Sequence, residues 1–159
     1  MTQELKRGAA RAVADVTSGM LLASIEIKAA PERVFQALAS EEIAQWWGSP
    51  QLYRVTKWVG EVRAGGQWKS TGIGHDGKPF EVGGEFLEVD PPRKLVQTWH
   101  PKWVDGPPTT VTYRLEAIEG GTRVTIKHEG FGDNADACRS HTEGWERVST
   151  WLSTWLEAQ

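Results

Sequence analysis

Cysteine is almost absent from this sequence of 159 residues, in which Cys138 is the single example. No disulfide can therefore form within the chain, and the cysteine content gives no sign of an oxidising compartment. The first residues lack the unbroken apolar core of a signal peptide, and no later run is apolar for long enough to cross a bilayer. The sequence therefore predicts a cytoplasmic protein without membrane insertion.

An excess of positive charge is also missing. The formal net charge is -3, and lysine and arginine are scattered among aspartate and glutamate. Proteins that bind nucleic acid or anionic membranes usually carry a basic patch, so neither partner is expected. Tryptophan, in contrast, is abundant, with nine residues. Because indole is large and its N–H needs a partner when buried, this number predicts a large aromatic interior or a lined cavity.

The chain contains no repeat or linker that would divide residues 19–159, which we expect to form a single domain. Residues 1–18 form a polar lead-in. Leu5, Ala9, Ala12, Val13 and Val16 would lie on one weak stripe if this segment were helical.

Hydrophobic periodicity predicts an α+β fold. Residues 21–29 alternate as a strand does, and two short helices should follow, the first with Pro31 in its first turn and the second between Ser40 and Gly48. Between residues 53 and 129, glycine- and proline-rich turns separate runs typical of about six antiparallel strands. Residues 135–157 should form one long helix. About seven strands are expected in total.

Two histidines stand at positions expected to face the interior. In the run TRVTIKHEGFG, His128 continues the inner face begun by Val124 and Ile126. His141 begins the apolar stripe of the long helix, which continues with Trp145 and Val148. They could be polar anchors for a ligand, or core histidines satisfied by backbone or water.

Several blocks resemble a known family. AAPERVFQALASEEIAQWWG, GGQW, GGEFLEVDPPRKLVQTWH, GGTRVTIKHEGF and HTEGWERV are similar, in this order, to blocks of the activator of heat-shock protein 90 ATPase homologue family. That family belongs to the START-like superfamily, also called SRPBCC or birch-pollen-allergen-like. The resemblance covers roughly residues 20–157. It implies a helix-grip fold, in which a curved antiparallel sheet grips the long C-terminal helix around a deep, mostly apolar cavity.

The resemblance implies a cavity and not a substrate. We expect a small hydrophobic or aromatic molecule between the sheet and the C-terminal helix, with no cofactor. Two alternatives stay open. The first is an enzyme of the cyclase, dehydratase or hydrolase kind that uses His128 or His141 as acid or base, with Glu81, Glu85 or Glu88 as a partner. The second is a chaperone-interacting module, although the eukaryotic co-chaperones of this family resemble the chain only in their C-terminal domain.

The expected ligand-binding residues are mainly aromatic. They are Phe35, Trp46, Trp47, Trp68, Trp99, Tyr113, His128, His141, Trp145 and Val148. Trp151 and Trp155 are further lining candidates, whereas Trp58 and Trp103 lie near strand ends or turns and could form a rim or a homodimer contact. No metal site is expected, because Cys138 and His141 have ligand-like spacing but lack further ligands nearby. GIGHDG matches a phosphate-binding pattern by letter, but a strand follows it and not a helix.

Overall fold

The computed structural model describes residues 9–159, which form eight strands and three helices. In chain order the elements are β1 (Arg11–Asp15), β2 (Met20–Ile27), α1 (Pro31–Leu38), α2 (Ile43–Trp46), β3 (Tyr53–Gly60), β4 (Gln67–Gly74), β5 (Pro79–Asp90), β6 (Lys94–Pro101), β7 (Thr109–Ile118), β8 (Gly121–Glu129) and α3 (Ala135–Glu157). The predicted α+β order, the two short helices and the long C-terminal helix are confirmed.

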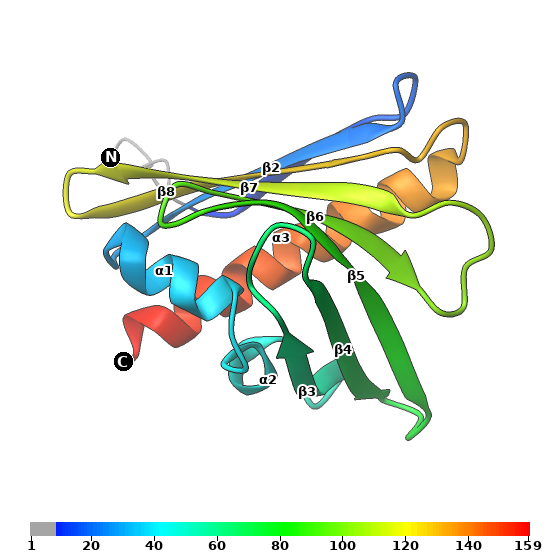
Figure 1. Ribbon diagram of the computed structural model, residues 1–159, viewed down its shortest axis with the longest axis horizontal. Coiled ribbons are helices and arrows are strands. Elements are labelled where there is room, and N and C mark those ends of the chain that lie inside the picture. Colours follow the sequence, from blue (N-terminus) through cyan, green and yellow to red (C-terminus); the bar gives the residue numbers. More distant parts are fainter. Residues whose placement is uncertain (1–8) are drawn as a thin grey trace, which may run out of the picture.

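The strands form one antiparallel sheet that curves around α3 (Figure 1). Their order is β1-β2-β8-β7-β6-β5-β4-β3. From β3 to β8, strands that are neighbours in the sheet are also consecutive in the chain. The early strand β2 pairs with β8, the last strand of the chain. Figure 1 shows α3 running beneath the sheet, with α1 and α2 covering the region near the C-terminal end of α3.

Alternation along the strands places the apolar residues on the concave face. In β2, Leu21, Ala23, Ile25 and Ile27 are buried, as the pattern predicts. The neighbouring strand β8 alternates in the same way, and its last buried residue is His128, which pairs with Leu21 of β2. The predicted inward position of His128 is therefore confirmed.

Local signals explain where the helices begin. Pro31 occupies the first turn of α1, where a missing N–H costs nothing. The Asn134 side chain accepts a hydrogen bond from the backbone N–H of Ala137 and caps α3. The second helix is shorter than predicted, because α2 begins at Ile43. Ser40 stabilises the turn before it by accepting a hydrogen bond from the N–H of Glu42.

Residues 11–15 of the lead-in do not form the helix that was considered for this segment, but form β1 and pair with β2. Leu5, part of the predicted stripe, lies outside the described residues. β1 supplies the eighth strand, whereas about seven were predicted. Its inner positions, Ala12 and Ala14, pack against the core, while Val13 faces outward. The segment therefore has the period of two that is characteristic of a strand.

The two halves of the sheet relate differently to α3. The helix packs on β1 and β2. Toward β3 the sheet and α3 diverge, and the space between them is where the cavity opens (Figure 1). Among residues 9–159, no helix combines the length and the apolar character needed to span a membrane.

Candidate functional site

A cavity of about 440 Å³ lies between the concave face of the sheet and α3. Its sheet-side walls come from β3 to β7, and none of its lining residues belongs to β1, β2 or β8. The volume falls within the range of about 300–1,000 Å³ that is typical of small-molecule sites. The lining residues are Leu38, Ile43, Trp47, Tyr53, Val55, Trp58, Trp68, Ser70, Phe80, Val82, Gln97, Trp99, Trp103, Tyr113, Ser140, His141, Gly144, Trp145, Arg147 and Val148.

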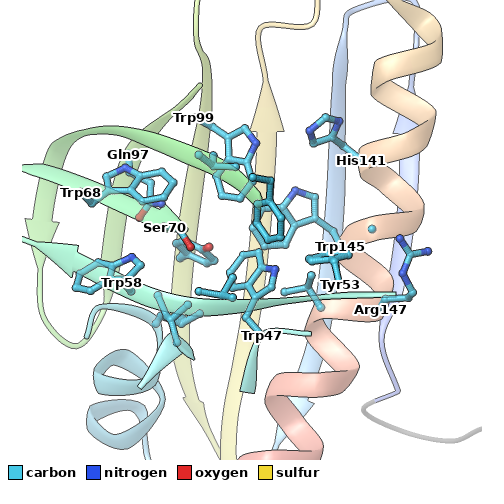
Figure 2. Close-up of a pocket in the computed structure, with 18 of the residues that line it drawn as sticks. Trp47, Tyr53, Trp58, Trp68, Ser70, Gln97, Trp99, His141, Trp145 and Arg147 are labelled. Carbon is cyan, nitrogen blue, oxygen red and sulfur yellow. The ribbon is translucent and has the colours of Figure 1, made fainter. Parts of the chain in front are cut away.

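Indole rings dominate the walls (Figure 2). Trp99 is central to them: it stacks on Trp47 at a centroid distance of 6.0 Å and contacts Trp68 at 5.5 Å and Trp145 at 5.8 Å. Trp145 also meets Tyr113 edge to face. Such contacts favour defined orientations of large rings, so the wall is a packed apolar surface.

Two consecutive tryptophans separate at the end of α2. Trp46 is buried, and its Nε1–H donates to the carbonyl of Ala37, which ties α2 to α1. Trp47 has left the helix and adopts an extended backbone, which turns its ring onto Trp99 in the cavity. Of this pair only Trp47 lines the cavity, and Trp46 is corrected to a core residue.

A glycine allows the Trp68 indole to lie against the sheet. Nε1–H of Trp68 donates to the carbonyl of Thr98 at 3.2 Å. A Cβ atom on Gly84, the neighbour of Trp68 in β5, would stand only 2.1 Å from that same carbonyl oxygen. The missing side chain in GGEF therefore lets β6 approach closely enough to anchor the ring.

His128 is fully buried and does not line the cavity. Its Nδ1 accepts a hydrogen bond from Nε1–H of Trp145 at 2.9 Å. Because Nδ1 is an acceptor, the proton of the neutral ring lies on Nε2, which donates to Oγ1 of Thr109 at 2.6 Å. The Thr109 hydroxyl donates in turn to the carbonyl of Trp99. Both ring nitrogens are thus used within the protein, so the expected ligand-binding or catalytic role of His128 is corrected to a structural one.

His141 lies in the cavity wall on α3 (Figure 2). Its Nδ1–H donates to the carbonyl of Ala137 at 2.9 Å, which leaves Nε2 as an acceptor. Within residues 9–159, no donor is hydrogen-bonded to Nε2. Burial lowers the pKa of His141, although the bond to Ala137 opposes this shift. His141 is therefore a neutral imidazole with a free lone pair.

Several other predicted positions also differ from the structure. Phe35 packs in the core from α1 and does not reach the cavity. Trp151 packs edge to face on Tyr53, and Trp155 lies under the guanidinium of Arg33, so neither lines it. Trp58, expected at a rim, is instead a buried part of the wall.

The carboxylates considered as catalytic partners do not enter the cavity. Glu85 and Glu88 are exposed, and Glu81 is paired with Lys102 at 3.7 Å. An irregular register between Phe86 and Glu88 turns the strand, which leaves Phe86 fully buried and Leu87 exposed. Among residues 9–159, no three His, Cys, Asp or Glu side chains gather as metal ligands would.

Apart from His141, sequence reasoning missed the polar side chains of the cavity. Gln97 and Ser70 line it from β6 and β4 and are only 6% and 7% exposed. Neither side chain is hydrogen-bonded to another group within the part of the chain that the structure describes. Both occupy inward positions in their strands, so strand parity could have found them. Buried polar groups usually have partners, so these two can bind a polar group of a guest molecule or water.

Aromatic side chains also form a rim at one side of the cavity. Trp103, in the loop after β6, is 65% exposed and meets Phe80 edge to face. Phe80 also meets Tyr53 edge to face. Arg147 on α3 lines the cavity as well. The cavity therefore has an aromatic border with one cation.

The two histidines should make the protein sensitive to acid. Burial lowers the pKa of both below the ordinary value of 6.5, and the second imidazole adds to the effect on His128. An unfolded histidine takes up a proton near pH 6.5, so the unfolded state binds more protons below this pH. We expect the free energy of unfolding to fall as pH drops from 6.5, by up to about 1.4 kcal/mol per pH unit for each histidine.

Urea titrations at pH 7.5, 6.5 and 5.5 measure this slope. His141→Gln should retain the fold and remove the contribution of His141 to this pH dependence. The free energy of unfolding of the variant should therefore fall less steeply with decreasing pH than that of the parent. Equal slopes for the two proteins would contradict a depressed pKa at His141.

One comparison with known proteins identifies a family. The family model described as activator of Hsp90 ATPase homolog 1-like protein matches residues 28–157. A comparison with curated proteins finds no match.

Solved structures share the fold. A protein from Rhodobacter sphaeroides superimposes with a TM-score of 0.81 at 22% identity, over 95% of this chain and 99% of the other. Protein Ms6760 from Mycobacterium smegmatis superimposes with a TM-score of 0.77 at 21% identity, over 93% of this chain and 96% of the other. The AHSA1 protein from Silicibacter pomeroyi superimposes with a TM-score of 0.72 at 26% identity, over 87% of this chain and 98% of the other.

Proposed function

This chain belongs to the activator of Hsp90 ATPase homolog 1-like protein family, and we propose that it binds a small hydrophobic or aromatic molecule between its sheet and α3. One observation carries the proposal. The cavity is walled by indole rings and yet contains buried Gln97 and Ser70 without protein partners. An apolar cavity with a few convergent polar groups is typical of a ligand site.

The shape of the site also favours a flat guest. Trp47 and Trp99 are nearly parallel, at 24°, whereas Trp145 meets Trp47 edge to face. Aromatic guests can use both arrangements against neighbouring rings, and each such contact contributes about 0.5–1.5 kcal/mol beyond the burial of area. A planar molecule with one or two polar atoms would satisfy the rings and the side chains of Gln97 and Ser70 together.

The proposal can be tested with N-phenyl-1-naphthylamine, a neutral dye that fluoresces in apolar sites. We expect saturable binding with a dissociation constant on the order of micromolar, since apolar contacts dominate. Native mass spectrometry of the protein from its own host should show a retained small molecule. A protein that is empty in the spectrometer and does not enhance the dye would argue against the proposed function.

A catalytic role for His141 is the second candidate function, and its free Nε2 is the observation that favours it. A neutral imidazole in contact with a ligand can accept a proton. The compound extracted from the protein would be incubated with the parent and with His141→Gln. Equal rates of conversion, or no conversion by either protein, would remove this candidate.

Cytoplasmic location and a homodimer contact through exposed Trp103 are further parts of the proposal. Fractionation of the host tests the location, and a membrane-associated pool would contradict it.

Sedimentation of the parent and of Trp103→Ser tests the homodimer contact. If both proteins sediment as monomers, the contact through Trp103 is contradicted.

A further inference from the structure

The cavity has an uneven distribution of charge. Among residues 9–159, its lining contains no aspartate, glutamate or lysine, and Arg147 is the single formally charged residue that contributes to it. The other ionisable side chains in the lining are neutral near pH 7, because burial raises the pKa of Tyr53 and Tyr113 and lowers that of His141. A guest therefore meets one positive charge that no acidic residue of the lining balances.

Arg147 is available to a guest. It projects from α3 on the same side of the cavity as Tyr53 (Figure 2), and it is exposed. Within residues 9–159 no carboxylate forms an ion pair with it. Its positive charge is near enough to lower the pKa of the Tyr53 phenol, in opposition to the larger effect of burial.

The neutral polar groups lie elsewhere in the cavity. Gln97 and Ser70 project from the sheet beside Trp68, whereas Arg147 projects from the helix (Figure 2). The rings of Trp47, Trp99 and Trp145 stand in contact with one another in the same cavity. The site can thus receive a charged group at the helix and an aromatic body against the indoles.

From this arrangement we propose that the ligand is an aromatic acid, whose carboxylate or similar monoanionic group binds Arg147 while its ring lies among the tryptophans. The inference rests on the proposed function and specifies the class of ligand. Guanidinium matches a carboxylate with two parallel, charge-assisted hydrogen bonds. A cationic guest would be repelled, because the lining contains no anion to receive it.

Three probes of nearly the same shape test the inference. They are 2-naphthylacetic acid, its neutral amide and 2-naphthylethylamine, and isothermal titration at low salt measures their binding. One charge-assisted contact predicts that the acid binds about tenfold more tightly than the amide, and the amine more weakly than both. Arg147→Gln should lower the affinity for the acid far more than that for the amide, so that the two affinities become nearly equal. Arg147→Lys should keep part of the preference.

Arg139→Gln is the matched control, because it removes the same charge from an exposed position on α3 that does not line the cavity. It should retain the preference for the acid. Equal binding of acid and amide by the parent would overturn the inference and leave the proposed function intact, as would a preference that persists in Arg147→Gln. If none of the three probes binds, both the inference and the proposed function fail.

Discussion

Replacing His128 with alanine should lower the free energy of unfolding by on the order of 4 kcal/mol. The substitution leaves Nε1–H of buried Trp145 without an acceptor, and it removes the donor to Oγ1 of half-buried Thr109, which keeps its bond to the carbonyl of Trp99. A buried polar group left unpaired costs about 1–3 kcal/mol, and the space vacated by the ring adds to this. Urea unfolding at pH 7.5, where the histidine is neutral, measures the loss.

His75→Ala is the matched control, because His75 is exposed in the β4–β5 turn. It should change stability by no more than about 0.5 kcal/mol. His128→Gln, whose amide offers one acceptor and one donor, should recover part of the loss. If His128→Ala were as mild as His75→Ala, the hydrogen bonds from Trp145 to His128 and on to Thr109 would not contribute as we expect.

Gly144→Phe should weaken dye binding strongly and leave the protein folded. Gly144 lines the cavity from α3, and a Cβ atom placed on it would meet nothing nearer than Nη2 of Arg147, at 3.9 Å. A phenyl ring can therefore extend into the empty space that a ligand would use. We expect affinity for N-phenyl-1-naphthylamine to fall by at least about tenfold. Stability should hold or rise by about 0.5 kcal/mol, because glycine is unfavourable inside a helix.

Gly144→Ala separates occupancy of the cavity from the change in helix propensity. It should raise the free energy of unfolding by up to about 1 kcal/mol and alter dye affinity by less than about threefold. Thermal unfolding and fluorescence titration of the two variants give the comparison. Dye affinity at the level of the parent in a folded Gly144→Phe protein would show that the dye binds elsewhere.

The lead-in shows how a local pattern can mislead. Ala12 and Val16 are four residues apart, as on one face of a helix, but Ala10, Ala12, Ala14 and Val16 also alternate as in a strand. Alanine has little apolar surface, so neither period stood out in the sequence. Pairing with β2 decided in favour of the strand, and this depends on a partner outside the segment.

The two histidines differ in how far prediction could reach. The alternation of β8 placed His128 inside, and the stripe of α3 placed His141 against the sheet, both from local periods. The partners of His128 were not predictable in the same way. Trp145 lies 17 residues away on another element, and Thr109 lies 19 residues away on β7. The pairing of β7 with β8 brings Thr109 to His128, and the packing of α3 against the sheet brings Trp145 to it.

The sequence by itself determined the order of the helices and strands from β2 onward and the residues that face inward, because these follow from repeats of two and of 3.6 residues. The resemblance of its motif blocks to a known family added the fold. Tertiary structure alone decided which inward residues fill the core and which border empty space. Trp46 and Trp47 are neighbours in the chain, yet one is locked against Ala37 and the other lines the cavity. The cavity exists because α3 packs on β1 and β2 while the sheet curves away toward β3, a separation that no local pattern encodes.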